Sequence, residues 1–336
     1  MEEINKKMYG QFFTIANPFD VDIFYKWYKM IPAKEKETVL EPFAGANNIL
    51  NLLSLINITP KWKCYDIAEF DFNNFEEYPV IQRDTLKDFP KGFTVGITNP
   101  PYLAKNSATR SGIEFPDSSY DDLYKISLSI MLANLRYVAA IIPESFITQN
   151  LFHDRLYAVV SLNYRMFDDT EHPVCLALFI PEKTDGENTD DFMLYHHNRF
   201  IDNYSGLRDQ LEYANYTDIA WKFNDPDGEI GVHCVDSISK PSIRFIKGVS
   251  IPPETVKGTS RAITRISGMP KGLDLDMLIR ELNVYLKDYR EKTKDVFLTA
   301  FKGIRKDGNF RRRLDYKTIR RMLNLIYERM VNKENE

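Results

Sequence analysis

Short apolar runs alternate with amphipathic stretches over roughly the first 180 residues of the chain. Strands are predicted at six apolar runs: 38–40, 62–66, 80–82, 93–97, 138–142 and 174–180. Helices are predicted between them, from the turn after residue 41 through residue 56, over 121–135 and over 150–158. Strands separated by helices indicate an α/β sheet that is mostly parallel and covered on both faces.

The pattern changes after residues 181–191, PEKTDGENTDD, which are polar and contain few apolar side chains. This segment is the predicted boundary between a first domain, 1–185, and a second, 190–336. The second domain is expected to be mixed α+β, with short β-like runs before residue 270 and amphipathic helices over 273–292 and 315–331. The apolar face of the last helix comprises Ile319, Met322, Leu323, Ile326 and Met330.

The composition argues against a membrane protein, a secreted protein and a metal-binding protein. The chain has 336 residues, 43% of them hydrophobic, yet no run approaches 18 apolar residues, so no membrane span is expected. The first residues, MEEINKKMYG, lack the apolar core of a signal peptide. Three separate cysteines and five histidines without ligand spacing argue for a reducing, cytoplasmic compartment and against a metal site.

The net charge of the chain is −4, and the charged residues are distributed unevenly along it. Residues 294–333 hold 12 Lys/Arg against 4 Asp/Glu, whereas residues 1–293 hold 32 against 42. A basic block of this kind suggests contact with a polyanion, although a solvated helix face would give the same count.

Acidic side chains follow three of the predicted strands. Glu41 opens the turn EPFAGANN, Asp66 ends the second strand and Asp84 follows the third. A strand that runs through a Gly-containing turn into a helix aims backbone N–H groups at a ligand, and an acid after the next strand can accept from ribose hydroxyls. The alternative for Asp66 and Asp84 is helix capping.

The segment TNPPYLAK, residues 98–105, follows the apolar run FTVGI. Two prolines stop the strand, so Asn99 and Tyr102 project from a stiff turn. An aromatic amine is a poor nucleophile, and the Asn99 side-chain oxygen and the Pro100 carbonyl can accept both of its hydrogens. Tyr102 can stack on a base.

Taken in order, these motifs resemble those of bacterial S-adenosylmethionine-dependent DNA adenine-N6 methyltransferases of the restriction–modification type, in the gamma class. YGQFFT near the N-terminus also resembles a segment of that family. The resemblance implies a Rossmann-like methyltransferase sheet whose last strand is antiparallel, followed by a DNA-recognition domain. It covers residues 9–180; beyond residue 190 it is only positional.

The resemblance assigns roles to individual residues. Asn99, Pro100 and Tyr102 would hold the target base. S-adenosylmethionine would be bound by ten residues: Thr14, Glu41, Phe43, Ala44, Gly45, Asp66, Ile67, Asp84, Thr85 and Pro101. Two departures are visible: Asn47 stands where the family often has a second Gly, and Thr85 where it often has Phe, so that Leu86 or Ile67 would pack on the adenine. Phe167, with His172 as second choice, would sandwich the target base.

Double-stranded DNA is the implied partner of a monomeric enzyme, and whether a restriction endonuclease acts on the same site stays open. An adenine must be flipped out of the duplex to reach such a pocket. Lys105 lies in a loop that is expected to order over the flipped base. Five arginines are expected to face DNA: Arg261, Arg265, Arg311, Arg312 and Arg313.

Other readings remain. The NPPY motif also occurs in methyltransferases of protein glutamine, and an RNA base or cytosine N4 could be the acceptor. A catalytically dead DNA-binding module would not need the intact motifs. Cytosine-C5 chemistry is disfavoured because no Pro-Cys motif is present.

Overall fold

The computed structural model describes residues 17–69, 72–162, 164, 166, 173–183, 190–208 and 219–334. The chain forms two compact units, Met1–Asn203 and Tyr204–Glu336. The change from one unit to the other therefore falls after the polar segment 181–191, because two further strands join the sheet of the first unit.

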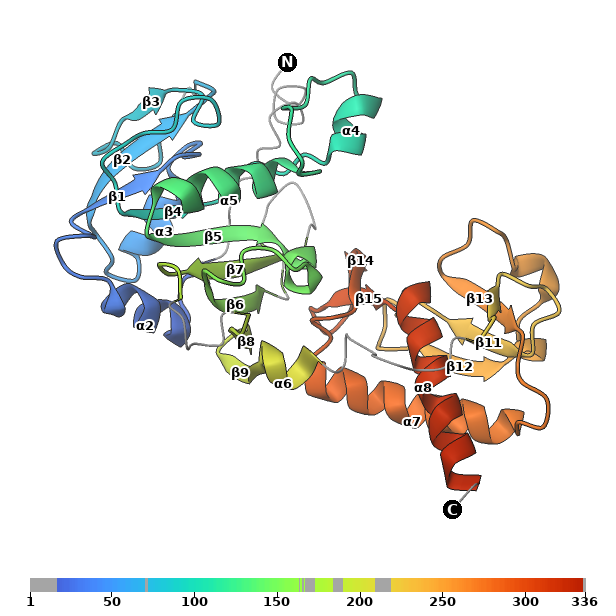
Figure 1. Ribbon diagram of the computed structural model, residues 1–336. Coiled ribbons are helices and arrows are strands. Elements are labelled where there is room, and N and C mark those ends of the chain that lie inside the picture. The colour runs from blue at the N-terminus through green and yellow to red at the C-terminus, as the bar shows by residue number, and fades with distance from the viewer. Residues whose placement is uncertain are drawn as a thin grey trace. The chain divides into compact units, whose positions relative to one another are not determined.

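A nine-stranded sheet organises the first unit (Figure 1). Its strands lie in the order β3-β2-β1-β4-β5-β7-β6-β8-β9. Their bounds are β1 Thr38–Glu41, β2 Lys61–Asp66, β3 Val80–Gln82, β4 Val95–Thr98, β5 Tyr137–Pro143, β6 Leu156–Leu162, β7 Val174–Phe179, β8 Met193–His196 and β9 Arg199–Asn203.

Strand direction confirms the predicted fold class. Strands β1 to β5 pair in parallel, whereas β7 is antiparallel to both of its neighbours, β5 and β6. The strand predicted at 174–180 is thus antiparallel to its neighbours, and β9 is likewise antiparallel to β8. The first unit is a Rossmann-like α/β sheet, and the second unit adds smaller antiparallel sheets.

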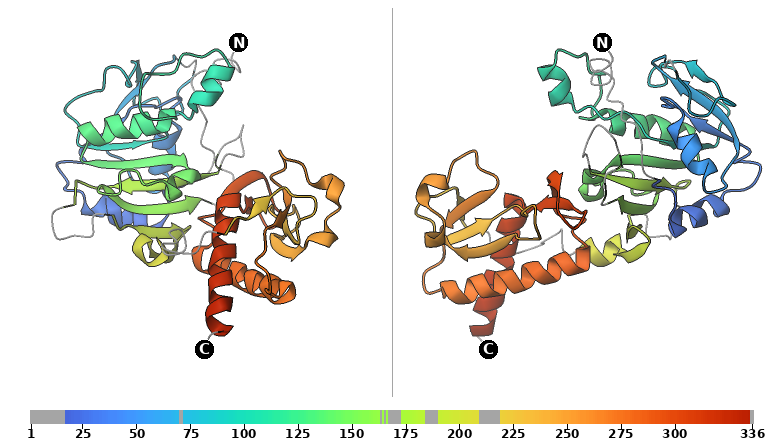
Figure 2. Two further views of the ribbon diagram at one scale, coloured as in Figure 1. Left: turned by 45° about the vertical axis from the view of Figure 1, so that its right-hand side comes forward. Right: turned by 180° about the vertical axis from the view of Figure 1, so that it is seen from behind.

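Helices cover both faces of this sheet. Helix α5, Leu123–Asn134, lies against one face, and α2, Asp22–Met30, and α3, Asn48–Ser54, lie on the other (Figures 1 and 2). Trp27 of α2 is fully buried, and its indole N–H donates to the Phe179 carbonyl of β7 over 2.9 Å. A short helix, α4, Lys105–Arg110, follows the NPPY segment.

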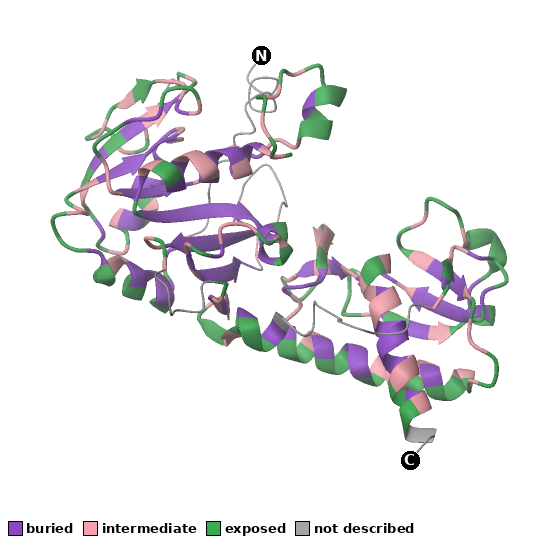
Figure 3. Ribbon diagram, viewed as in Figure 1, coloured by how far each residue is buried: buried purple, intermediate pink, exposed green. Residues whose placement is uncertain are grey.

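The helix predicted over 150–158 is wrong: residues 156–162 form strand β6 in the middle of the sheet. Six of its seven residues are buried, and β5 and β7 beside it are buried along their whole length (Figure 3). A strand covered on both faces shows no alternation of apolar and polar residues, so its apolar run cannot be told from a buried helix.

The second unit combines a four-stranded antiparallel sheet, a hairpin and two long helices. The sheet has the order β10-β13-β11-β12, and the hairpin is β14-β15. The bounds are α6 Tyr204–Arg208, β10 Lys222–Phe223, β11 Ile230–His233, β12 Arg244–Lys247, β13 Ile263–Ser267, α7 Leu275–Thr293, β14 Thr299–Ile304, β15 Phe310–Arg313 and α8 Tyr316–Glu334.

Polar side chains from the two long helices close this unit. Asn283 of α7 accepts from the Phe245 N–H over 2.9 Å and donates to the Phe245 carbonyl over 2.8 Å, which satisfies the backbone of edge strand β12. Asn324 of α8 accepts from the buried Trp221 indole over 2.7 Å. The five apolar residues predicted to line one face of α8 are all buried.

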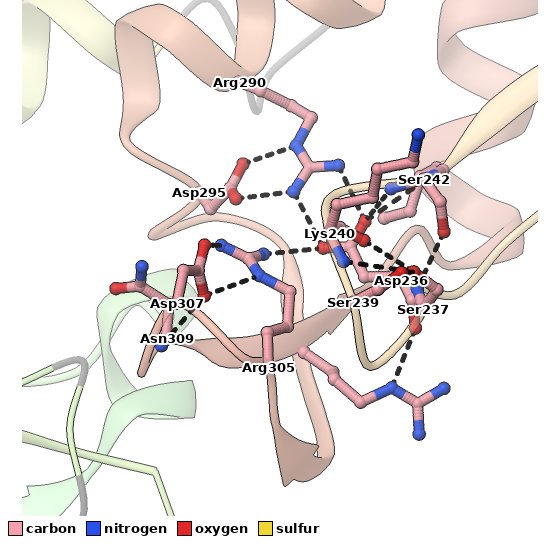
Figure 4. Close-up of polar contacts among 12 residues, drawn as sticks. Asp236, Ser237, Ser239, Lys240, Ser242, Arg290, Asp295, Arg305, Asp307 and Asn309 are labelled. Atoms are coloured by element: carbon pink, nitrogen blue, oxygen red, sulfur yellow. Dashed lines mark hydrogen bonds and ion pairs between the residues drawn. The ribbon is translucent and has the colours of Figure 1, made fainter.

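An ion network around Asp236 ties four segments of the second unit together (Figure 4). Asp236 is fully buried and accepts from Arg290 at 2.8 and 3.0 Å and from Arg305 at 3.0 Å. Arg290 also binds Asp295, and Arg305 also binds Asp307. Burial alone would raise the pKa of Asp236, but its bonds to Arg290 outweigh that effect and lower the pKa.

We expect Asp236→Ala to destabilise the second unit by roughly 3–5 kcal/mol, because it leaves buried guanidinium groups without their counter-charge. Hydrogen exchange of peptides from residues 219–334, measured along a urea series, reports this loss. The matched control is Asp276→Ala, since Asp276 forms an exposed ion pair with Lys247 that is worth about 1 kcal/mol or less. Equal effects of the two substitutions would contradict a structural role for the network.

Candidate active site at the carboxyl edge of the sheet

The order of the strands reverses between β1 and β4. Strand β1 pairs with β2 on one side and with β4 on the other. From β1 the chain continues to β2 and β3 in one direction across the sheet, and from β4 it continues to β5 in the opposite direction. Ligands of open α/β sheets bind outside the carboxyl ends of the strands at such a reversal. Glu41, Asp66 and Thr98 are the last residues of β1, β2 and β4.

Glu41 lies at the reversal and is completely buried. Its Oε1 accepts from the Phe43 N–H over 3.0 Å and from the Thr98 hydroxyl, which joins the end of β1 to the end of β4. Among the residues that the structure describes, none makes a hydrogen bond to its Oε2. A buried carboxylate oxygen without a donor costs free energy, so this atom fits a ligand that brings an N–H or O–H group.

The environment of Glu41 favours its neutral form. Burial raises its pKa from 4.5 to about 8, the bonds from Thr98 and Phe43 oppose that rise, and the nearby charge of Asp66 adds to it. A cationic ligand group beside the free oxygen would favour ionisation instead.

The turn after β1 is held in a left-handed conformation. Gly45 and Asn47 have φ values of 51° and 61°, as expected from the tolerance of Asn for positive φ. The Asn47 amide donates to the Tyr78 carbonyl and to Asn73 at 2.8 and 2.9 Å. The Ala44 N–H donates to the Tyr65 carbonyl over 2.9 Å, which fixes the turn against β2. Phe43 is half-buried and Ala44 is buried.

Asp66 connects the same turn to the end of β2. Its two oxygens accept from the Gly45 N–H over 2.8 Å and from the Ala68 N–H over 2.9 Å. The side chain is buried at the carboxyl edge. A carboxylate has about four acceptor positions, so this structural role is compatible with the predicted contact to a ribose.

The residues predicted to surround the cofactor's adenine differ in their surroundings. Asp84 is partly exposed; its Oδ1 accepts from the Leu86 N–H over 3.2 Å, and Lys87 lies 3.3 Å from its other oxygen. The Thr85 hydroxyl is buried and donates to the Pro42 carbonyl over 2.9 Å. Ile67, directly after Asp66, is 40% exposed and offers an apolar surface at this edge.

The NPPY segment leaves the neighbouring strand β4. The Tyr102 hydroxyl lies 2.5 Å from Asn99 Oδ1 and 2.6 Å from the Ile141 carbonyl oxygen of β5. One hydroxyl hydrogen serves one acceptor at a time, so Tyr102 can bond either oxygen. Its ring is 8% exposed and meets Tyr124 edge-on, and burial raises its pKa. Pro100 is buried and Pro101 half-buried.

Backbone contacts clamp the segment that follows. The Leu103 N–H donates to the Asp122 carboxylate over 3.2 Å, and the Lys105 N–H to the Asp121 carbonyl over 2.8 Å. Asp122 also caps helix α5. Asp122 and Thr98 were not among the residues predicted for this site. Their signals were a capping acid before an apolar helix and a hydroxyl directly before NPPY.

Several predicted residues lie on other elements or outside the described part of the chain. Thr14, Phe167 and His172 fall outside the described residues. Lys105 is exposed at the start of α4. Of the five arginines predicted to face DNA, Arg261 is exposed and Arg311 and Arg313 are half-buried.

The other two arginines, Arg265 and Arg312, were predicted to face DNA, but they do not lie at the surface. Both are buried, and the Arg265 Nε donates to the Gly228 carbonyl over 3.0 Å. Each sits in a strand, where alternate side chains point to opposite faces, so a run such as Arg311–Arg313 cannot present every member to the same partner.

Within the described ranges, no group of His, Cys, Asp and Glu could hold a metal ion. In the same part of the chain, no helix is long and apolar enough to cross a membrane.

Comparison with known proteins finds similarity in structure only. No protein-family model and no curated protein sequence matches the chain. Similar solved structures include the methyltransferase subunit of a type I restriction–modification system from Streptococcus thermophilus (15% identity, TM-score 0.36, covering 53% of this chain and 47% of that chain). They also include the M protein of the type I restriction enzyme EcoKI (14%, 0.34, 48% and 44%) and the ATP-dependent type ISP restriction–modification enzyme LlaBIII bound to DNA (14%, 0.39, 55% and 20%).

The matched part of this chain spans less than half of each of these three proteins. All three are described as proteins of restriction or restriction–modification systems. Identities and TM-scores this low assign no activity to the chain, so its own residues have to indicate one.

We expect the free energy of unfolding of the first unit to fall by about 1.4 kcal/mol per pH unit between pH 4.5 and about 8 because of Glu41 alone. In this window the folded chain keeps the Glu41 proton and the unfolded chain has lost it, so rising pH favours unfolding. Glu41→Gln should remove this slope in urea unfolding followed by hydrogen exchange of residues 38–66. The control is Glu37→Gln, at an exposed pair with Lys61. An unchanged slope in Glu41→Gln would show that Glu41 is not protonated.

Proposed function

We propose that the chain is an S-adenosylmethionine-dependent methyltransferase that methylates N6 of a flipped adenine in duplex DNA. One observation carries the proposal: Glu41, whose buried Oε2 has no hydrogen-bond partner among the described residues, is hydrogen-bonded to Thr98, the residue before Asn99. Glu41, a candidate residue for binding the cofactor, and Asn99, a candidate residue for binding the target base, thus lie at the ends of adjacent strands. Holding two reactants together in this way removes much of the entropic barrier to group transfer.

The residues at the edge fit the cofactor by their chemistry. Glu41 Oε2 would accept from its amino group, and Asp66 from its ribose hydroxyls. Ile67 offers apolar contact, whereas the Thr85 hydroxyl already serves the fold. When bound, S-adenosylmethionine supplies an electrophilic methyl group.

Asn99 and Pro100 would hold the acceptor amine. The Asn99 Oδ1 and the Pro100 carbonyl oxygen accept its two hydrogens and favour a geometry in which the nitrogen lone pair can attack. The Tyr102 hydroxyl would then turn its hydrogen to the Ile141 carbonyl, which lies within the same bonding distance as Asn99. Oδ1 becomes available without leaving the tyrosine hydroxyl unpaired. Tyr102 also contributes the aromatic surface beside the base.

DNA is favoured over the other acceptors by the second unit. Its exposed side chains include ten cations between the start of the β11–β12 loop and the β14–β15 turn: Lys240, Arg244, Lys247, Lys257, Arg261, Lys271, Arg280, Lys287, Lys292 and Lys306. Lys and Arg at the surface neutralise phosphates. A methyltransferase of a protein glutamine has no need of such a surface, whereas an RNA methyltransferase would share it. A role as the modification half of a restriction–modification system, with a cytoplasmic location, rests on the motif resemblance alone.

Nucleoside mass spectrometry after incubation with S-adenosylmethionine and unmethylated duplex DNA tests the reaction. We expect N6-methyladenine from the wild-type chain and at least about a hundredfold less from Asn99→Ala, with unchanged cofactor binding, because positioned proton acceptors contribute about 10²–10⁴-fold. The matched control is Asn106→Ala, at an exposed position of α4. N4-methylcytosine would change the base, and no modified base despite cofactor binding would refute a DNA substrate. Full turnover by Asn99→Ala would refute the role of Asn99.

We expect S-adenosylmethionine binding to release about one proton at pH 7, because Glu41, with a pKa of about 8, must ionise beside a cationic amino group. Calorimetric titration in two buffers of different ionisation enthalpy measures this number. Glu41→Gln should bind more weakly and release no proton from this position. Equal proton release by both proteins would assign the proton to another group.

A further inference from the structure

The loop between β11 and β12 is an exposed but firmly held element of the second unit. Ser237 organises it: its hydroxyl bonds the Lys240 carbonyl at 2.9 Å, the Lys240 N–H at 3.2 Å and Ser239 at 2.9 Å. The Ser237 N–H donates to the Ser242 hydroxyl over 2.7 Å. The backbone between Ser237 and Ser242 therefore has one hydrogen-bonded conformation.

The Asp236 network holds both ends of this loop. Asp236 Oδ1 accepts from the Ser242 and Ile243 N–H groups at 2.7 and 3.3 Å, while its own N–H donates to the Arg312 carbonyl over 2.9 Å. Figure 4 shows Ser242, Arg290 and Arg305 converging on the Asp236 carboxylate. Buried ion pairs contribute little net stability compared with apolar packing, and here they fix the position of a surface loop.

The turn of the β14–β15 hairpin lies beside the loop. The Lys306 N–H donates to the Ile238 carbonyl over 2.8 Å, and the Arg311 Nε donates to the Asp236 carbonyl over 2.8 Å. The Arg311 guanidinium also lies over the Phe301 ring at 5.0 Å. Loop and turn thus form one surface, named here the loop–turn surface and defined by residues 237–240, 306 and 311.

The exposed side chains of the loop–turn surface combine cations with one large apolar residue. Lys240 and Lys306 are exposed. Ile238, at the tip of the loop, is 61% exposed and is not needed to close the loop, whose bonds come from serine side chains and the backbone. An apolar side chain on a rigid surface that also carries cations has the chemistry of a group that enters a DNA groove, with apolar contact to bases and cations on the flanking phosphates.

We infer that the loop–turn surface contacts duplex DNA directly, with Ile238 against the bases and Lys240 and Lys306 on phosphates. This inference rests on the proposed function and adds to it the element that meets the duplex. A pre-ordered loop binds with a smaller loss of conformational entropy than one that orders on contact. Asp236, Arg290 and Arg305 act as positioning residues for it.

The phosphate contacts are tested with a fluorescent 30-base-pair duplex of random sequence, bound to the full chain between 50 and 200 mM salt. The doubly substituted variant Lys240→Gln/Lys306→Gln should reduce the slope of log affinity against log salt by about 2, since each neutralised phosphate contributes about 0.9. The matched control is Lys287→Gln/Lys292→Gln, at two exposed lysines of α7 that pair with acids on the same helix. Its slope should match that of the wild-type chain.

The base contact is tested with Ile238→Ser and with methyl transfer to unmethylated plasmid DNA. We expect kcat/KM for transfer to fall about tenfold, in the range of one lost base contact, with an unchanged salt slope and unchanged cofactor binding. The control is Val249→Ser, at a residue of the same unit that is 82% exposed. The urea midpoints of all four variants should equal that of the wild-type chain, since each substitution is at the surface.

The outcomes separate the two proposals. A wild-type chain that shows neither salt-dependent DNA binding nor transfer would overturn the proposed function and this inference with it. A wild-type chain that binds and methylates DNA, together with loop–turn variants that behave like their controls, would overturn this inference alone.

Discussion

The hydrogen bond between Thr98 and Glu41 is the contact on which the candidate site depends. It crosses from the end of β4 to the end of β1, where the strand order reverses. Because the strands around it are buried, the carboxylate there is removed from water, which makes its charged form costly. The fold satisfies one of its oxygens with two donors and leaves the other without one among the described residues. The edge is therefore built for a ligand that completes the set of donors.

The segment that follows β4 at the same edge is held rigidly. Two prolines fix the backbone after Asn99, the Asp122 carboxylate and the Asp121 carbonyl hold the backbone just beyond Tyr102, and the Tyr102 hydroxyl lies between two acceptors at nearly equal distances. A group with two equivalent acceptors can release one of them at little cost, because its hydrogen bond is exchanged rather than lost. The hydrogen bond from Tyr102 to Asn99 is thus one that can be exchanged for the bond to Ile141.

Sequence patterns predicted those parts of the fold that local chemistry determines. Strand β2, the Gly45–Asn47 turn and the apolar face of α8 follow from alternation, positive φ and helical period. Strand β6 was missed because burial on both faces removes its pattern. Buried Arg265 and Arg312 were misjudged because charge counts do not show which strand face a residue occupies. The contact of Thr98 with Glu41 joins residues 57 positions apart, and only the parallel pairing of β1 with β4 brings them together.

Two of the buried carboxylates, Glu41 and Asp236, are held in opposite ways, and the contrast separates structure from function. Asp236 meets two guanidinium groups and two backbone N–H groups, so its charge is balanced and its pKa is lowered. Glu41 meets no cation among the described residues, and its pKa is raised to about 8. A protein that needed Glu41 only for packing could replace it with an uncharged residue of similar shape and gain stability. The incomplete hydrogen bonding of Glu41 among the described residues is typical of a ligand-binding acid. The complete hydrogen bonding of Asp236 is typical of a structural acid, here one that holds the β11–β12 loop in place.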